Sequence, residues 1–441
     1  MLYPLSYEGG LDDSTRRASR QPPTHRYDHP VAGPTPTHLL PDSAEVGGDG
    51  RLHVGGVDLL ELAAEFGTPL FVYDEAHLRA RCRETVEAFG EGNAVYATKA
   101  FLCRAMARLA HEEGMLLDVA TGGEMHVALS AGVPPDRLVV HGNNKSIDEL
   151  RTAVASGVHH VVVDSFDELD RLESLHGEGL PAPQVQLRIT PGVEAHTHEY
   201  VRTGHDDTKF GFGLASGAAA AAVDRAAGSP SVELVGLHAH IGSNVFAVDS
   251  FARATEVMAA FAKPYGLPTL TLGGGLGVAY VEGEEAPTIA QWGKVLRDAV
   301  AASGLKGDVL VEPGRAIVAA AAITLYTVGT VKDLPGIRTY VAVDGGMSDN
   351  PRPVLYGSGY EAFLPRSTMA DRPKAVRVVG KHCESGDVLV SEAWVPSDLA
   401  VGDILATPVT GAYGHSMGSN YNKVTRPPVV FVRDGAARLV V

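Results

Sequence analysis

The stretch AVYATKAFLCRAMARLAHEEGMLLDV, residues 94–119, contains the structural unit that decides the fold. It opens and closes on short apolar runs, and the segment between them is rich in Ala, Leu, Arg and Glu and has helical length. Buried strands that alternate with helices in this way are typical of a parallel sheet, because a crossover helix returns the chain to the start of the next strand. The stretch therefore predicts a strand–helix–strand unit.

The same unit recurs along much of the chain. Eight apolar or β-branched runs lie between residues 56 and 312, at 94–97, 116–119, 138–141, 160–163, 185–189, 234–238, 269–272 and 308–311. Segments compatible with helices, such as 251–261, separate them. Eight strand–helix repeats in succession predict an α/β fold, a (β/α)8 barrel of the TIM type.

The sequence pattern changes after the last strand–helix repeat. Strands then alternate with turns, and no long helical pattern remains; examples are 339–343, 375–379 and 429–432. We therefore expect the barrel over residues 51–316 and a C-terminal β-sandwich or β-barrel domain over 317–441, to which residues 51–57 would add a strand.

The first 50 residues differ from both parts. They are rich in Pro and in turn-forming residues and lack apolar periodicity. Segments of this composition cannot bury enough apolar surface to fold alone. We expect residues 1–50 to be a poorly ordered leader, or the result of a start codon assigned too early.

Composition argues against several classes of function. The 441 residues carry 37 Lys and Arg against 53 Asp and Glu, a formal net charge of −16, which argues against nucleic acid or an anionic membrane as a partner. The 3 cysteines are too few and too scattered for a disulfide framework or a zinc knuckle. The longest apolar runs, such as 318–328, are shorter than the roughly 20 residues of a membrane helix. With no secretory signal pattern in view, we expect a cytoplasmic protein.

Chemistry in such barrels lies at the C-terminal ends of the strands, so the residues there indicate function. Lys99 follows the first strand, His240 the sixth, the glycines of 273–277 the seventh, and Glu312 ends the eighth. A lysine in a cavity would have its ammonium form disfavoured and act as an amine nucleophile. Gly-rich turns can bind a phosphate, a carboxylate can keep a ring nitrogen protonated, and an imidazole can stack on a ring. Together these groups describe a pyridoxal phosphate site.

Each of these signals is weak alone, and alternatives stay open. A strand-end lysine is more often an ion-pair partner, and three successive glycines are usually a tight turn. His238 and His240 are spaced as a metal pair at a strand end would be, as in amidohydrolase-type barrels. Against a metal site, no second histidine cluster is joined by an Asp at the eighth strand.

Several motifs in fixed order also resemble a known family. They lie at 95–101, 141–146, 194–199, 209–211, 240–243, 273–277, 312–315, 344–353, 383–387 and 411–417. The chain resembles the fold-type III pyridoxal phosphate decarboxylases, most closely the actinobacterial diaminopimelate decarboxylase family, from about residue 50 to its end. Asn244 and Thr271 depart from the pattern, which commonly has Gln and Asp there. The resemblance implies an alanine racemase-like barrel.

The resemblance implies roles around the cofactor. Lys99 would bind pyridoxal phosphate covalently, Glu312 would pair with its ring nitrogen, and His240 would stack on the ring. A racemase of this fold class has an arginine in place of the glutamate, which makes the ring a poorer electron sink. The cofactor-binding set would be completed by Ser243, Gly275, Gly314, Arg315 and Tyr413.

The resemblance also implies a substrate and a partner. The expected reaction is the decarboxylation of meso-2,6-diaminopimelate to L-lysine and CO2, the last step of lysine biosynthesis, in a homodimer that shares its active sites. Cys383 would come from the second subunit and donate a proton. The residues expected to contact the substrate are Arg315, Arg352, Tyr356, Glu384 and Tyr413.

Other interpretations remain beside this one. One is a related enzyme acting on another basic amino acid, for which Arg352 with Glu384 is the discriminator, because lysine or ornithine lacks the distal carboxylate and needs no cation there. A non-catalytic pyridoxal phosphate-binding protein of the single-barrel kind would lack the C-terminal β domain. A metal hydrolase is the more remote alternative. His196 and His198 lie on a polar stretch that we expect to form a mobile lid over the site.

Overall fold

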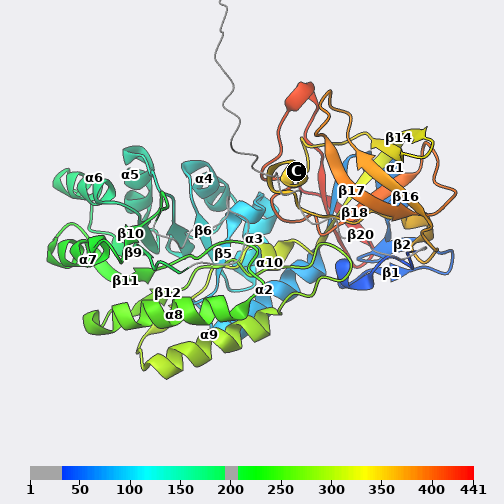
Figure 1. The fold of residues 1–441 in the computed structure, drawn as a ribbon. Helices are drawn as coiled ribbons and strands as arrows, with labels where there is room; N and C mark the ends of the chain where they lie inside the picture. The colour runs from blue at the N-terminus through cyan, green and yellow to red at the C-terminus, as the bar shows by residue number, and fades with distance from the viewer. Residues whose placement is uncertain (1–31, 194–206) are drawn as a thin grey trace, which may run out of the picture.

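The computed structural model describes residues 32–193 and 207–441. Residues 1–31 of the expected leader therefore lie outside the described residues, as do His196 and His198 of the expected lid. Within the described part, the chain forms two assemblies that lie side by side (Figure 1). One is built around a parallel sheet and the other around a mainly antiparallel one.

All eight runs predicted as strands form the parallel sheet, and the barrel is confirmed. The strands are β5 (Val95–Ala97), β6 (Leu116–Val119), β7 (Leu138–Val140), β8 (His160–Val163), β9 (Gln184–Thr190), β11 (Glu233–His238), β12 (Thr269–Thr271) and β13 (Asp308–Leu310). They pair in the order β13-β12-β11-β9-β8-β7-β6-β5, and the short β10 (Phe212–Gly213) pairs with β9. A parallel bridge between Ala94 and Val311 joins the two ends of this order.

Helices cover the outside of the barrel (Figure 1). They are α2 (Glu75–Phe89), α3 (Arg104–Glu112), α4 (Gly122–Ser130), α5 (Ile147–Ser156), α6 (Phe166–Gly177), α7 (Ala218–Gly228), α8 (Val248–Ala262) and α9 (Ile289–Ser303). Side-chain caps fix where several of them begin: Thr121 caps α4, and Ser146 caps α5 in a reciprocal capping box with Glu149. Such a cap is worth about 1 kcal/mol and lets a helix begin directly after a strand-end loop. The caps therefore help to hold the loops at the C-terminal ends of the strands.

The second sheet contains one strand that precedes the barrel in the chain and seven that follow it. It runs β17-β16-β15-β14-β4-β19-β20, with β18 beside β14. Its strands are β4 (Leu70–Asp74), β14 (Ala322–Leu334), β15 (Arg338–Val343), β16 (Lys374–Val379), β17 (Val388–Val395), β18 (Ile404–Pro408), β19 (Val429–Arg433) and β20 (Ala436–Leu439). The strand that enters this sheet from before the barrel is thus β4, whereas residues 51–57 were expected to do so.

The burial of the two segments explains the difference. Every residue of β4 is buried, and it lies between β14 and β19, which satisfy its backbone on both edges. The segment at 51–57 instead forms β2 (Leu52–Val54) and enters β3 (Val57–Asp58), in a small separate sheet with β1 (Glu45–Val46). The helix α1 (Leu59–Phe66) follows it. We propose a domain division that counts β4 with the second sheet.

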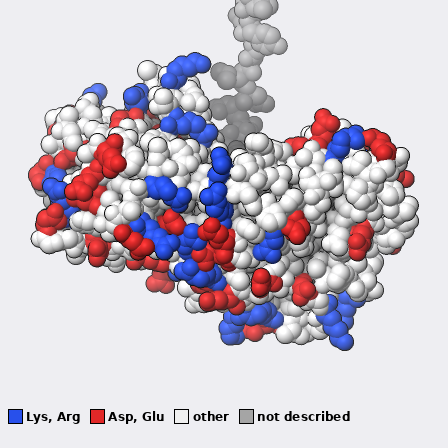
Figure 2. Space-filling model, turned by 180° about the vertical axis from the view of Figure 1, so that it is seen from behind, with Lys and Arg blue, Asp and Glu red and all other residues white. Residues whose placement is uncertain are grey.

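The two assemblies touch next to the first barrel strand. The rings of Tyr73 in β4 and Phe101 are stacked with centroids 4.3 Å apart, and the Tyr413 N–H donates to the Ala100 carbonyl at 2.8 Å. There are also two short helices: α10 (Arg315–Val318) follows β13, and α11 (Arg352–Tyr356) follows β15. Positive and negative side chains are interspersed on the face shown in Figure 2. Among the described helices, none has the length and apolar character needed to span a membrane.

Candidate active site

A cavity of about 310 Å³ lies at the C-terminal ends of the barrel strands, as the fold predicts. Its wall combines barrel residues with residues of the C-terminal region. The lining side chains include Lys99, Asp118, His141, Arg188, Phe210, His238, His240, Ser243, Glu312, Arg315, Tyr356, Tyr413 and Met417. Seven of the twelve residues predicted for the site are in this set: Lys99, His240, Ser243, Glu312, Arg315, Tyr356 and Tyr413.

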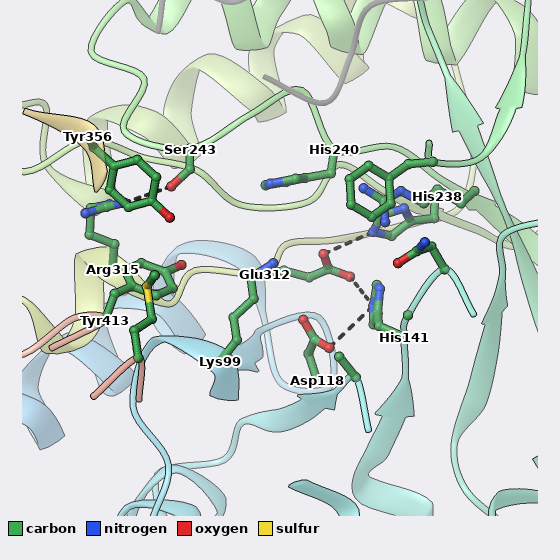
Figure 3. A pocket seen from close by; sticks show the side chains of 16 residues that line it. Lys99, Asp118, His141, His238, His240, Ser243, Glu312, Arg315, Tyr356 and Tyr413 are labelled. Carbon is green, nitrogen blue, oxygen red and sulfur yellow. Dashed lines mark hydrogen bonds and ion pairs between the residues drawn. The ribbon is translucent and has the colours of Figure 1, made fainter. Parts of the chain in front are cut away.

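Lys99 reaches the cavity from the turn after β5 (Figure 3). Its side chain is accessible to solvent from the cavity, and its amine points toward Glu312. The surrounding protein disfavours the ammonium form, but Tyr413, Asp118 and Glu312 outweigh this effect and raise the pKa of Lys99. The sequence-based expectation that the cavity disfavours the ammonium is therefore wrong, because Tyr413 and the carboxylates of Asp118 and Glu312 together stabilise the charged form.

Glu312 follows β13 and is held by two imidazoles. The His238 Nε2–H donates to Glu312 Oε2 at 3.0 Å, and His141 Nε2 lies 2.8 Å from Glu312 Oε1 (Figure 3). Burial opposes ionisation of Glu312, but the two histidines outweigh it and hold its pKa well below the usual range. Glu312 is consequently a carboxylate at neutral pH, which suits it to pair with a protonated ring nitrogen.

The two imidazoles differ in charge. Burial lowers the pKa of His238 to about 4, so this ring is neutral and donates one hydrogen bond. His141 is also buried, but Asp118 and Glu312 outweigh the burial and raise its pKa. Its Nε2 lies 4.0 Å from Asp118 Oδ1, so the ring is placed between two carboxylates. His141 is thus the cation that balances Glu312.

These contacts also bear on the metal alternative. His141, His238 and Glu312 offer three potential ligand atoms within 4.8 Å of one another. The sequence suggested His238 with His240 as the metal-binding pair, but this group contains His141 and not His240. The His240 Nδ1 instead accepts a hydrogen bond from the Gly274 N–H at 3.3 Å. The carboxylate that would ligate a metal is already engaged by both imidazoles.

The turns after β11, β12 and β13 come close enough to require glycine. Gly275 has a φ of +105°, and a Cβ there would collide with the Gly242 carbonyl. A Cβ on Gly314 would lie 2.9 Å from the Ala97 carbonyl oxygen. Both glycines are therefore needed for the packing of the loops around the cavity, and their predicted contact with a phosphate stays a prediction.

Polar groups suited to a phosphate gather near these turns. The Arg315 Nη2 donates to Ser243 Oγ at 2.9 Å, and the Arg315 guanidinium lies 4.9 Å from the centroid of the Tyr413 ring. A guanidinium with hydroxyl groups beside it is a good donor set for a phosphate. Together with Lys99, Glu312 and the His240 ring, the residues present fit pyridoxal phosphate.

Besides the two glycines, three predicted residues do not line the cavity of this chain. Cys383 and Glu384 are exposed in the loop between β16 and β17, where Glu384 accepts a hydrogen bond from the Tyr421 hydroxyl. Arg352 is 3% exposed but packs behind the cavity wall, and its guanidinium donates to the Tyr360 hydroxyl. The structure thus leaves the expected contacts of these three residues with substrate as predictions.

Sequence reasoning assigned no role to several residues that line the cavity. Asp118, His141 and Arg188 lie at strand ends, which was the signal available for them. The Arg188 Nη1 lies 3.5 Å from Asp164 Oδ1, and the guanidinium carbon lies 4.1 Å from the centroid of the Phe210 ring. The position of a residue at a strand end does not tell which distant residue it will contact. The contacts of Asp118, His141 and Arg188 are therefore known only from the folded chain.

The barrel, the lysine and the ionised glutamate define a class of protein, and comparison with known families agrees. Residues 75–319 match the family model described as pyridoxal-dependent decarboxylase, pyridoxal binding domain. The chain belongs to the family of pyridoxal-dependent decarboxylases, and its cofactor is pyridoxal phosphate.

More specific relatives narrow the family. The chain is 50% identical over 411 residues to the diaminopimelate decarboxylase of Mycobacterium tuberculosis, covering 89% of this chain and 92% of the relative. It is 44% identical to that of Bacillus subtilis, covering 89% and 92%. Among solved structures, the diaminopimelate decarboxylase of M. jannaschii in complex with L-lysine aligns with a TM-score of 0.83 and 31% identity, covering 90% and 94%. Within the decarboxylases, the chain falls in the diaminopimelate decarboxylase family.

Proposed function

We propose that the cavity carries out the decarboxylation of meso-2,6-diaminopimelate to L-lysine and CO2, the last step of lysine biosynthesis. The relatives named for this activity cover most of the chain. The observation that carries the assignment of residues is the placement of Lys99 opposite a Glu312 carboxylate that two histidines keep ionised.

The cofactor end of the site follows from these contacts. Pyridoxal phosphate, when bound, supplies a ring that accepts the electron pair freed as CO2 leaves. Lys99 supplies the amine that holds it covalently, and Glu312 keeps a proton on the ring nitrogen. His240 would stack on the ring, while Ser243, the N–H groups of the glycine turns and the Tyr413 hydroxyl would donate to the phosphate.

The substrate end needs groups for an amine and a carboxylate. The carboxylate that leaves is the one next to the cofactor-bound amine, so the distal amino acid group remains in the product L-lysine. Arg315 and Tyr356 line the cavity, which supports their assignment to the distal carboxylate. Arg352 packs against Tyr280 and Tyr360 and adds a second positive charge there. Glu384 is assigned to the distal amine.

We infer that a second copy of the chain completes the site. Cys383 and Glu384 are exposed in this chain and line no part of its own cavity, although the proposed chemistry needs both. In a homodimer, each loop would enter the cavity of the partner, where Cys383 donates a proton to the carbon from which CO2 has left. The assignment to the cytoplasm stays a prediction.

The test is the release of CO2 from meso-diaminopimelate compared with L-lysine, L-ornithine and L-arginine, each at matched concentration with added pyridoxal phosphate. The proposal expects turnover of diaminopimelate and little of the other three, because these lack the distal carboxylate. Preference for any of the three would assign the chain to a related decarboxylase. No CO2 from any of the four would contradict the proposal.

A further inference from the structure

Two guanidinium groups near the substrate end are buried. Arg315 is 6% exposed and Arg352 is 3% exposed. Within residues 32–193 and 207–441, no carboxylate lies at ion-pair distance from either one. Their partners are hydroxyl groups, those of Ser243 and Tyr280 for Arg315 and that of Tyr360 for Arg352. Buried cations without a counterion are costly, so this arrangement favours the binding of an anion.

Tyr280 is the residue that the two arginines share. It is 4% exposed and follows the glycine-rich turn after β12. Its hydroxyl accepts a hydrogen bond from Arg315 Nη1, and the guanidinium of Arg352 lies 4.3 Å from the centroid of its ring. The negative face of an aromatic ring stabilises a cation placed over it, so one side chain engages both charges.

The tyrosine is itself held on two sides. Its backbone N–H donates to Glu284 Oε2 at 2.8 Å, which fixes the turn. Its ring meets that of Tyr360 edge to face, with centroids 5.3 Å apart and an interplanar angle of 77°. Tyr280 therefore has little freedom to move with respect to either arginine.

The two arginines that Tyr280 contacts differ in their position relative to the cavity. Arg315 reaches the cavity, whereas Arg352 does not line it and packs against the tyrosine pair. We propose that Tyr280 is a positioning residue for substrate specificity, which holds Arg315 toward the distal carboxylate with Arg352 as a second positive charge behind it. This inference rests on the proposed function, because it takes the distal carboxylate as the anion.

The test uses two ligands that differ by one carboxylate. L-lysine and pentane-1,5-diamine present the same terminal amine to the cofactor, but only L-lysine has the carboxylate. Their binding to the enzyme loaded with pyridoxal phosphate is measured by calorimetry for the wild type, Tyr280→Phe and Tyr280→Leu. The same variants are assayed for kcat and KM with meso-diaminopimelate.

Tyr280→Phe removes the hydroxyl that Arg315 uses and keeps the ring under Arg352. We expect it to weaken the binding of L-lysine about tenfold and to raise the KM for diaminopimelate by a similar factor, since a hydrogen bond to a charged group is lost. The affinity for the diamine and kcat should change little. Tyr280→Leu removes the ring as well and should weaken L-lysine further.

A matched control is Tyr326→Phe, which removes another buried tyrosine hydroxyl, one bonded to Asp349 in the β domain. It should leave the ratio of the two affinities unchanged. If Tyr280→Phe keeps the wild-type ratio, or weakens both ligands equally, the positioning role is refuted. If Tyr280→Leu does not fold, Tyr280→Phe alone decides. A wild type that does not prefer L-lysine to the diamine would instead refute the carboxylate subsite of the proposed function.

Discussion

The barrel wall of the cavity and the loop that carries Cys383 are both held by hydrogen bonds, but only the wall faces the cavity of its own chain. In the wall, both His141 and His238 contact the Glu312 carboxylate inside the cavity. The loop has an equally firm base but faces outward. Asp387 accepts from the backbone N–H groups of Met347 at 2.6 Å and His382 at 2.8 Å, while Cys383 is exposed.

The difference shows how each region obtains its function. Strand ends of a closed barrel converge on one point, so groups from distant strands meet without help from another molecule. A loop on the edge of the second sheet has no such point of convergence. An exposed loop with reactive side chains and a hydrogen-bonded base is suited to a surface outside its own chain, which we propose to be a second copy. The predictions below test this contrast between the wall and the loop.

The largest effect is expected from Lys99→Ala. Without the amine the cofactor cannot be held covalently, so CO2 release should fall by several orders of magnitude. The visible absorbance of the loaded enzyme should be lost as well. Lys294→Ala is the control, since that side chain is 72% exposed on α9 and pairs with Asp298 at the surface. Activity that survives in Lys99→Ala would remove the lysine from the mechanism.

Mixing two inactive variants tests whether the wall and the loop come from different chains. Lys99→Ala and Cys383→Ala are unfolded together, refolded and assayed. In a mixed dimer one cavity has both intact residues, so random pairing should restore about a quarter of wild-type activity. A mixture of Lys99→Ala with the Lys99→Ala/Cys383→Ala double variant should stay inactive. If the first mixture also stays inactive although mixed dimers form, the sites are not shared.

A pH-dependent effect is expected from His141→Gln, within the wall. His141 favours the charged form of Glu312, so its loss should raise the pKa of that carboxyl and move the acidic limb of kcat/KM to higher pH. An unchanged acidic limb would show that His141 does not control the ionisation of Glu312.

The same variant should change stability in a defined direction. The folded-state pKa of His141 is raised, so its contribution is fully present below its unfolded pKa of about 6.5 and is lost as the pH rises through the folded value. The depressed pKa of Glu312 gives a contribution present above about pH 4.3 and lost in acid as the pH falls through its folded value. The difference in unfolding free energy between wild type and variant, measured with denaturant, should therefore be largest between these two pH values.

The smallest effect is expected in the loop. Tyr421→Phe removes the hydroxyl that donates to Glu384 and leaves the ring beside His382, 5.2 Å between centroids. Because the pair is exposed, we expect only about a two- to threefold rise in the KM for diaminopimelate, without a change in Tm. A drop in kcat with unchanged KM would mean that the tyrosine acts on Cys383 instead.

Much of the fold could be predicted because its signals are local. The eight apolar runs correspond to the eight barrel strands, and Lys99 and Glu312 could be placed from their positions at strand ends. The prediction for 51–57 failed because a short apolar segment does not specify which edge it will join. The burial of β4 depends on β14, about 250 residues later in the chain, and on β19, about 360 residues later.

The sequence by itself determined the period of the strands, the class of cofactor and the side chains offered at the strand ends, since these depend on neighbours along the chain. Only the tertiary structure decided which of them meet. His238 and Glu312 are 74 residues apart, and closure of the barrel brings them to hydrogen-bonding distance. The packing of the C-terminal region against the barrel places Tyr280 against Arg352, and Tyr413 of that region, with two barrel carboxylates, reverses the expected pKa shift of Lys99. Charge and burial at a site are sums over groups from distant strands, so they exist only once the strands are in register.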